Sequence, residues 1–257
     1  MDSPSDQSSL ADLAILVVDD HEINREFLST GLARLAGNVS LAANGAEAIA
    51  LCQSTDFDVI LLDLHMPRMD GLATANRIRD LDSASAAARM IILTADTRPE
   101  ERNRLLNAGI DAYLNKPITL PDLVSAINDL LQPGSRHRSG RLVDEQQSRL
   151  LDHKRALDAA NHDADLARRL TAMLVEELQS GLPRLDEMMR QGQFDQASAL
   201  LHQWAGAAGY AGAIRFGGSC RSLRRCLDSG LDSSPGTGYL DFLRVARATE
   251  QALQERL

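Results

Sequence analysis

The chain has 257 residues, of which 44% are hydrophobic and 25% are charged. This length exceeds what one ordinary domain needs and allows two domains, each with its own core. Cys52, Cys220 and Cys226 form no C-x-x-C pair, so we expect neither a disulfide framework nor a zinc site, and the reducing cytoplasm is favoured. No apolar run approaches the roughly 20 residues that cross a bilayer, which argues against membrane insertion.

Charge is distributed unevenly along the chain. Residues 1–132 hold 10 Lys and Arg against 20 Asp and Glu, a net charge of −10, whereas residues 133–257 hold 17 against 16, a net charge of +1. An acidic first part argues against direct nucleic-acid binding and favours a cation or a basic partner. The chain begins with a polar and acidic stretch, and we predict a disordered tail over residues 1–11.

Short apolar runs alternate with helical patterns between residues 12 and 132. The runs predict strands at 14–18, 39–42, 59–62, 90–93 and 110–114, and helices are expected at about 22–36, around 47–51, from 71, at 100–108 and at 121–131. The run Val59 to Leu62 is too short for a helix and indicates a strand buried on both faces. Strands that alternate with helices predict crossover units and a parallel sheet, an α/β domain.

Chemically active side chains follow the ends of these strands. A parallel sheet with right-handed crossovers gathers such residues along one edge, where open α/β folds bind their ligands. The residues concerned are Asp19, Asp20, Asp63, Thr94 and Lys116. Without a cation, three clustered carboxylates raise at least one pKa, and Mg2+ relieves this because it prefers oxygen ligands. With Lys116 as a fixed cation and the Thr94 hydroxyl as a donor to phosphoryl oxygen, the pattern indicates phosphoryl transfer to Asp63.

Each of these residues also has an ordinary structural explanation. A single aspartate after a strand is usually a helix cap or turn residue, Lys116 alone would be a surface lysine, and Thr94 a turn hydroxyl. The joint pattern favours the site, because the chain contains only two lysines and one of them follows the fifth strand. We predict that His21 and His65, which lie beside the acids, are solvated loop residues rather than metal ligands through their side chains.

The set resembles the receiver domain of two-component response regulators over residues 12–132. The resemblance is carried by Asp63, Gly71 and the pairs Asp19-Asp20, Met66-Pro67, Thr94-Ala95 and Lys116-Pro117, and Asn24-Arg25 resembles receivers attached to hybrid histidine kinases. It implies a flavodoxin-like sheet of five strands in the order 2-1-3-4-5. It also implies Asp63 as the phosphoacceptor and a cis peptide bond before Pro117.

The same resemblance implies a metal site and a switch. Mg2+ would be held by Asp20, Asp63 and the main-chain carbonyl of His65, with Asp19 supporting it through water. Thr94 and Tyr113 fall at the positions of the pair that reports phosphorylation.

The composition changes after residue 132. Residues 132–141 contain no large apolar residue and several turn formers, so we predict a linker over 133–143. Beyond it, apolar stripes predict helices over about 166–185, 194–208, 216–227 and 239–257, with a kink at Pro183 in the first. Residues 144–257 are therefore predicted to form an all-α four-helix bundle.

His202 is the unusual residue of this predicted bundle. It lies one residue off the apolar stripe of Leu201 and Trp204, so we expect it to face solvent. Its helical neighbours are all small: Ser198, Ala199, Ala205 and Gly206. Glycine within a helix costs up to about 1 kcal/mol relative to alanine, so the presence of Gly206 needs a reason. A surface kept clear of side chains, so that another protein can approach His202, is such a reason. An ordinary polar surface histidine is the alternative.

Residues 200–206 resemble a histidine-containing phosphotransfer (HPt) domain, whose bundle histidine accepts a phosphoryl group from a receiver aspartate. The family pattern His-x-Leu-Lys-Gly-Ser corresponds here to His202-Gln203-Trp204-Ala205-Gly206-Ala207. Ala205 thus stands where the family has lysine, and Ala207 where it has serine. Three arginines on the next predicted helix are candidates to supply the missing charge, the alternative being a solvated basic face: Arg221, Arg224 and Arg225.

The sequence therefore predicts a cytoplasmic phosphorelay protein in which neither an ATP-binding kinase core nor a Gly-rich phosphate loop is recognisable. A separate sensor histidine kinase would phosphorylate Asp63, and His202 would exchange phosphoryl with Asp63 or with an upstream or downstream receiver. The alternative is a phosphorylation-controlled interaction module whose bundle binds or dimerises without transfer. DNA binding is disfavoured, since the second half is nearly neutral and shows no helix-turn-helix pattern.

Overall fold

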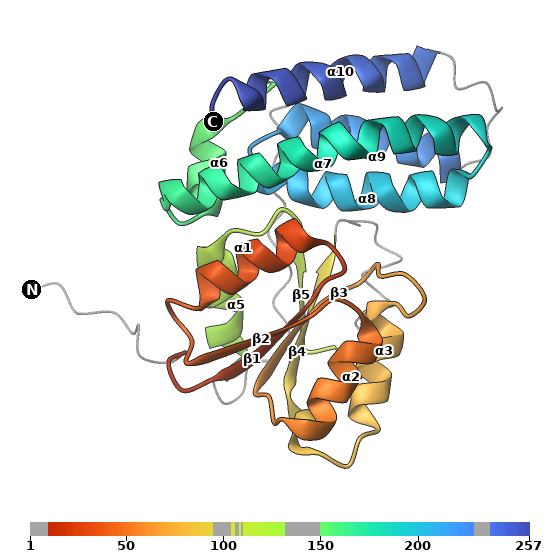
Figure 1. The fold of residues 1–257 in the computed structure, drawn as a ribbon. Coiled ribbons are helices and arrows are strands. Elements are labelled where there is room, and N and C mark those ends of the chain that lie inside the picture. Colours follow the sequence, from red (N-terminus) through yellow and green to blue (C-terminus); the bar gives the residue numbers. More distant parts are fainter. Residues whose placement is uncertain (1–9, 95–103, 106–107, 109, 132–149, 229–236) are drawn as a thin grey trace, which may run out of the picture. The chain divides into compact units, whose positions relative to one another are not determined.

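The computed structural model describes residues 10–94, 104–105, 108, 110–131, 150–228 and 237–257 (Figure 1). The chain divides into two compact units, residues 1–142 and 143–257. The predicted linker and most of the predicted helix 100–108 lie outside the described residues, although 104–105 are helical. The predicted tail lies outside them too, except for its last two residues, of which Leu10 is buried.

The first unit is a five-stranded parallel sheet covered by helices on both faces. Its strands are β1 (Ala14–Val18), β2 (Asn38–Ala42), β3 (Val59–Asp63), β4 (Arg89–Thr94) and β5 (Ala112–Asn115), in the order β2-β1-β3-β4-β5. Helices α1 (Glu22–Leu32) and α5 (Leu120–Leu131) cover one face, and α2 (Gly45–Ser54) and α3 (Gly71–Arg79) cover the other (Figure 1). A short 3-10 helix, η1 (Ala84–Ala87), precedes β4. The predicted α/β fold and strand order are confirmed.

The pairing register brings the carboxyl ends of the central strands level with one another. Val18 pairs with Leu62, Asp63 with Leu93, and Thr94 with Asn115. Every residue of β3 is buried, as predicted for an apolar strand covered on both sides. Polar side chains at these strand ends therefore share one edge of the sheet.

The turn after β3 is shaped by a close approach between β3 and α3. The Gly71 N–H donates to the Leu64 carbonyl at 2.9 Å, and a Cβ added at Gly71 would lie 2.4 Å from the Asp63 carbonyl oxygen. Asp70 caps α3, because its side chain accepts from the Ala73 N–H at 2.7 Å. A residue without a side chain is thus required where α3 starts beside Asp63.

The second unit is helical. It contains α6 (His153–Ala159), α7 (Ala164–Arg190), α8 (Phe194–Tyr210), α9 (Ile214–Asp228) and α10 (Thr237–Gln254). Helices α8 and α10 each pack against both α7 and α9, which gives the predicted four-helix arrangement, and the short α6, which we did not predict, packs on α7 and α8. Helix α7 continues through Pro183, and the kink predicted there stays a prediction.

An aromatic cluster lies in the core of this bundle. Trp204 of α8 stacks on Phe242 of α10 with ring centroids 6.4 Å apart and contacts Phe216 of α9 at 5.9 Å. The indole N–H donates to Glu177 of α7 at 3.0 Å, so the buried ring keeps a polar partner. Trp204 therefore connects all four helices.

None of the helices in the described ranges combines the length and the apolar character that spanning a membrane requires.

We predict that Gly71→Ala lowers the free energy of unfolding by about 1–3 kcal/mol, because the new methyl group would overlap backbone atoms that have little freedom to move. Urea denaturation followed by circular dichroism measures this. Gly238→Ala is the matched control, since a Cβ there has no neighbour within 4 Å. It should be neutral or stabilise α10 by up to about 1 kcal/mol. Equal stability of the Gly71→Ala protein and the wild type would contradict the close approach.

Candidate functional site

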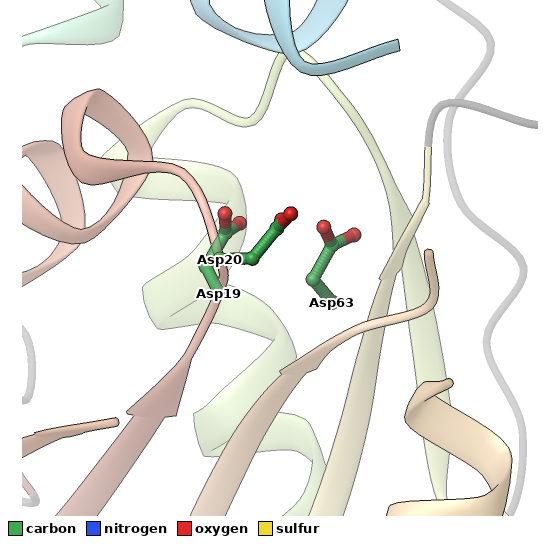
Figure 2. A group of neighbouring side chains, drawn as sticks. All are labelled: Asp19, Asp20 and Asp63. Carbon is green, nitrogen blue, oxygen red and sulfur yellow. The ribbon is translucent and has the colours of Figure 1, made fainter. Parts of the chain in front are cut away.

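Three carboxylates lie together at the carboxyl edge of the sheet (Figure 2). Asp19 and Asp20 follow β1, Asp63 ends β3, and one ligand oxygen from each lies within 4.8 Å of the others. Asp19 and Asp63 are buried, with exposed fractions of 0% and 2%, whereas Asp20 is partly exposed. The structure therefore brings the predicted acidic residues into one cluster that opens through Asp20.

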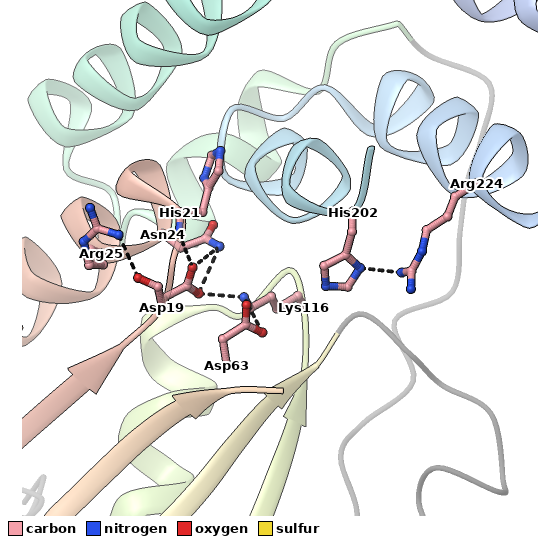
Figure 3. A network of polar contacts seen from close by, with 8 residues as sticks. All are labelled: Asp19, His21, Asn24, Arg25, Asp63, Lys116, His202 and Arg224. Atoms are coloured by element: carbon pink, nitrogen blue, oxygen red, sulfur yellow. Dashed lines mark hydrogen bonds and ion pairs between the residues drawn. The ribbon is translucent and has the colours of Figure 1, made fainter. Parts of the chain in front are cut away.

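Lys116 supplies the cation of this cluster (Figure 3). Its Nζ lies 2.7 Å from Asp19 Oδ2 and 3.0 Å from Asp63 Oδ1, and its side chain is only 3% exposed. The Lys116 N–H donates to the Thr94 carbonyl at 2.7 Å, which fixes the residue beside the end of β4. The expected cis peptide bond between Lys116 and Pro117 is confirmed.

Burial dominates the ionisation of Asp63. It raises the pKa of the Asp63 carboxyl to about 7, and the charges of Asp19 and Asp20 add to the rise, while the ammonium of Lys116 opposes it. One lysine thus stands against three carboxylates, which leaves a formal charge of −2 in a largely buried site. The site favours an added cation.

Asp19 has partners that hold it in place. Asn24 Nδ2 lies 3.0 Å from both carboxylate oxygens, and the His21 N–H donates to Oδ1 at 2.9 Å (Figure 3). Arg25 donates to the Asp19 carbonyl at 2.7 Å. Asn24 and Arg25 entered our sequence interpretation only as a family resemblance. Their position on the first turn of α1, a few residues after the acidic pair, was the available signal for this supporting role.

The cluster fits a small divalent cation. It offers carboxylate oxygens, which are the ligands that Mg2+ prefers. Asp20 and Asp63 are better placed to hold such an ion than Asp19, because the oxygens of Asp19 already face Lys116, Asn24 and the His21 N–H. A contribution from the main-chain carbonyl of His65 stays a prediction.

The remaining predicted residues of this unit lie nearby. Thr94 ends β4 with an exposed fraction of 1%, and Tyr113 lies in β5, 8% exposed and paired in register with Ile92. Their role as a switch stays a prediction. The prediction that His21 is solvated is wrong: it is 5% exposed, and its N–H is bound to Asp19 at the start of α1, whereas His65 is partly exposed.

His202 lies on α8 and is only 6% exposed, so the prediction that it faces solvent is wrong. Helix α8 packs closely against α9, so a position one residue off the apolar stripe can still contact a side chain of another helix. Arg224 of α9 reaches across, with its Nη1 2.5 Å from His202 Nδ1 (Figure 3). A guanidinium thus lies against the imidazole.

The small residues near His202 serve the packing of α8 on α9. A Cβ added at Gly217 of α9 would lie 3.3 Å from the Ala208 Cβ and 3.5 Å from the Ala205 carbonyl. Ala205 is itself buried, with an exposed fraction of 4%. The prediction of a surface cleared for another protein is therefore wrong for Ala205. Small side chains at Ala205 and Ala208 instead let α8 and α9 approach each other closely.

The three arginines of α9 that were predicted to supply charge to His202 differ in their surroundings. Arg224 contacts His202, whereas Arg225 is exposed and donates to Ser222 at 3.3 Å. Arg221 is partly buried one turn earlier. Arg224 is therefore the arginine whose described contact places a positive charge beside His202.

Comparisons with known proteins agree with this geometry. Residues 15–128 match the response regulator receiver domain, and residues 169–255 match the Hpt domain. The chain is 30% identical over 219 residues to the sensor histidine kinase AruS of Pseudomonas aeruginosa, covering 85% of this chain and 21% of that protein. It is 29% identical over 236 residues to the signal transduction histidine-protein kinase BarA of Escherichia coli K12, covering 88% of this chain and 25% of BarA.

This chain thus spans about a quarter or less of these relatives' length. The chemotaxis protein CheY4 of Vibrio cholerae is a similar solved structure, with 31% identity, a TM-score of 0.45 and coverage of 47% of this chain and 100% of that one. Asp63 falls inside the first matched domain and His202 inside the second. Residues 15–128 of this chain therefore form a response regulator receiver domain, and residues 169–255 form an Hpt domain.

Proposed function

We propose that the receiver domain takes a phosphoryl group from a sensor histidine kinase onto Asp63, and that His202 exchanges phosphoryl with a receiver aspartate. The observation that carries the proposal is the buried pair of contacts from Lys116 to Asp19 and Asp63 beside the partly exposed Asp20. Phosphoryl transfer needs positioned groups and charge neutralisation more than it needs covalent chemistry from the protein. The first unit offers both at one carboxylate.

At Asp63, a carboxylate oxygen forms the new bond to phosphorus while the bond from phosphorus to the donor's histidine nitrogen breaks. Lys116 lies 3.0 Å from Asp63 Oδ1 and is held there by Asp19, so its charge is positioned before the donor arrives. Mg2+ bound by Asp20 and Asp63 would neutralise further charge on the phosphoryl oxygens. Thr94, at the neighbouring strand end, is the hydroxyl that we assign to a phosphoryl oxygen.

Phosphorylation of Asp63 would then change the conformation of neighbouring residues in the sheet. A phosphoryl group adds a charge of about −2 in place of a carboxylate, which changes the balance around Lys116. Thr94 and Tyr113 are buried on adjacent strands, β4 and β5, and we propose that they reset together. The surface formed by these strand ends would then dock differently onto partners.

The proposed partners are a sensor histidine kinase and at least one further receiver. AruS and BarA are named as histidine kinases, and this chain matches only a part of each. We place the reaction in the cytoplasm, because the described cysteines Cys52, Cys220 and Cys226 form no disulfide, as is usual in a reducing compartment.

The relay can be tested with this protein alone. We predict that His202→Gln, phosphorylated on Asp63 with radiolabelled acetyl phosphate and freed of donor, passes label to added Asp63→Asn protein. The label on the acceptor should be stable to hydroxylamine and labile to acid, as a phosphoramidate is. His153→Gln in the Asp63→Asn background is the matched control, because that exposed histidine has no proposed role.

Label that stays on Asp63 of the donor and never reaches the acceptor would contradict the relay. It would leave the phosphorylation-controlled interaction module as the better description. Failure of Asp63 to label at all, in folded protein with Mg2+ present, would contradict the receiver step itself.

We also predict that Asp20→Asn weakens Mg2+ binding by about tenfold or more, since it removes one charge and one ligand from the cluster. Isothermal titration calorimetry of the full chain measures the affinity. Asp82→Asn removes the same charge from an exposed position in the same unit and should leave the affinity unchanged. Equal affinities for the Asp20→Asn and wild-type proteins would exclude Asp20 as a ligand.

A further inference from the structure

The contact between Arg224 and His202 constrains the chemistry of the imidazole. A guanidinium carries donors only and is never deprotonated in proteins. The Nδ1 atom that faces Arg224 Nη1 must therefore accept, which leaves the proton of the neutral ring on Nε2. In this arrangement the lone pair of Nδ1 is engaged and Nε2 has none to offer.

The guanidinium is held on its other side as well. Arg224 Nε lies 3.5 Å from Asp228 Oδ2, and the second oxygen of Asp228 accepts from the Ser198 hydroxyl at 2.7 Å. Ser198 lies on α8 one turn before His202, and Asp228 is the last residue of α9. The chain of contacts from Ser198 through Asp228 and Arg224 to His202 therefore links the two helices, although the ion pair to the half-exposed Asp228 is a weak one.

We propose that Arg224 is a positioning residue that holds His202 in the tautomer with its proton on Nε2, and that phosphotransfer requires the guanidinium to leave Nδ1. The second half rests on the proposed function, and the first does not. In transfer, the Nε2 lone pair forms the bond to phosphorus while the bond from phosphorus to the donor's carboxylate oxygen breaks and its electron pair stays on that carboxylate. The attacking ring carries its proton on Nδ1 and becomes an imidazolium.

A proton on Nδ1 cannot face an arginine donor. The observed contact therefore disfavours both the attacking tautomer and the cationic ring that forms. Arg224 restrains the reactivity of His202 until the guanidinium is withdrawn.

Nitrogen NMR of isotope-labelled full-length protein, at a pH where the ring is neutral and without any phosphodonor, tests the first half. Wild type should show Nδ1 unprotonated and Nε2 protonated. Arg224→Glu places an acceptor-only side chain there and should reverse the two, with Nδ1 protonated. Arg225→Glu makes the same charge change on the exposed side of α9 and should keep the wild-type pattern.

A wild-type ring with Nδ1 protonated would overturn the assignment, and this result does not depend on how any variant folds. An Arg224→Glu protein that is folded but keeps the wild-type tautomer would overturn it too.

The rate of transfer tests the second half. In the Asp63→Asn background, Arg224→Met should take label from phosphorylated His202→Gln protein about tenfold faster than Arg225→Met, the factor corresponding to a charged hydrogen bond. Both variants lose one positive charge from α9, so the comparison separates the local contacts of Arg224, with His202 Nδ1 and Asp228, from the loss of charge. A slower rate for Arg224→Met would show that Arg224 promotes transfer and would overturn the restraint.

If the Asp63→Asn protein itself takes no label, the proposed function fails while the tautomer assignment stands on its spectrum. If transfer proceeds normally but the spectrum shows Nδ1 protonated, only the inference about Arg224 fails.

Discussion

The buried ammonium of Lys116 is the interaction on which the receiver site depends. It lies between Asp19 and Asp63, within 3.0 Å of both, and it is a single charge against three carboxylates. Removing water from such a site makes every uncompensated charge costly. Burial raises the pKa of the Asp63 carboxyl to about 7, and the neighbouring charges of Asp19 and Asp20 add to the rise. A divalent cation would bring the formal charge of the site to zero. Because the site lacks positive charge, it is suited to binding a metal ion first, and the bound ion would then help to neutralise an incoming phosphoryl group.

The fold supplies the geometry that this charge balance needs. Parallel pairing sets the ends of β1, β3 and β4 level, so Asp19, Asp63 and Thr94 reach one edge from segments far apart in the chain. Gly71 lets α3 begin against the carbonyl of Asp63, and Asn24 on α1 fixes the carboxylate of Asp19. In the helical unit, charged side chains likewise surround the candidate phosphoacceptor. Arg224 contacts the imidazole of His202 and pairs with Asp228.

Most of the receiver domain could be predicted from sequence, because its strands are recognised from local residue patterns and its site residues from the topology of a parallel sheet. Four-residue apolar runs give the strands, parallel topology gives the shared edge, and the residues after each run give Asp19, Asp63 and Lys116. The surroundings of His202 could not be predicted in this way. Helical periodicity separates the core stripe of Leu201 from the rest, but whether a flanking position is covered depends on how closely another helix packs. Here Gly217 allows α9 to approach α8, and a side chain from α9 then reaches the ring. The burial of His21, the residue that precedes α1, could not be predicted from helical periodicity either.

The central claim is that the charge balance around Lys116 selects one of three neighbouring carboxylates as the phosphoryl acceptor. The most direct measurement is borohydride reduction of the full-length protein after phosphorylation with acetyl phosphate and Mg2+, followed by peptide mass spectrometry. Borohydride converts an aspartyl phosphate to homoserine and leaves free carboxylates unchanged. The account predicts homoserine at position 63 and aspartate at positions 19 and 20. Homoserine at position 19 or 20, with Asp63 intact, would contradict it.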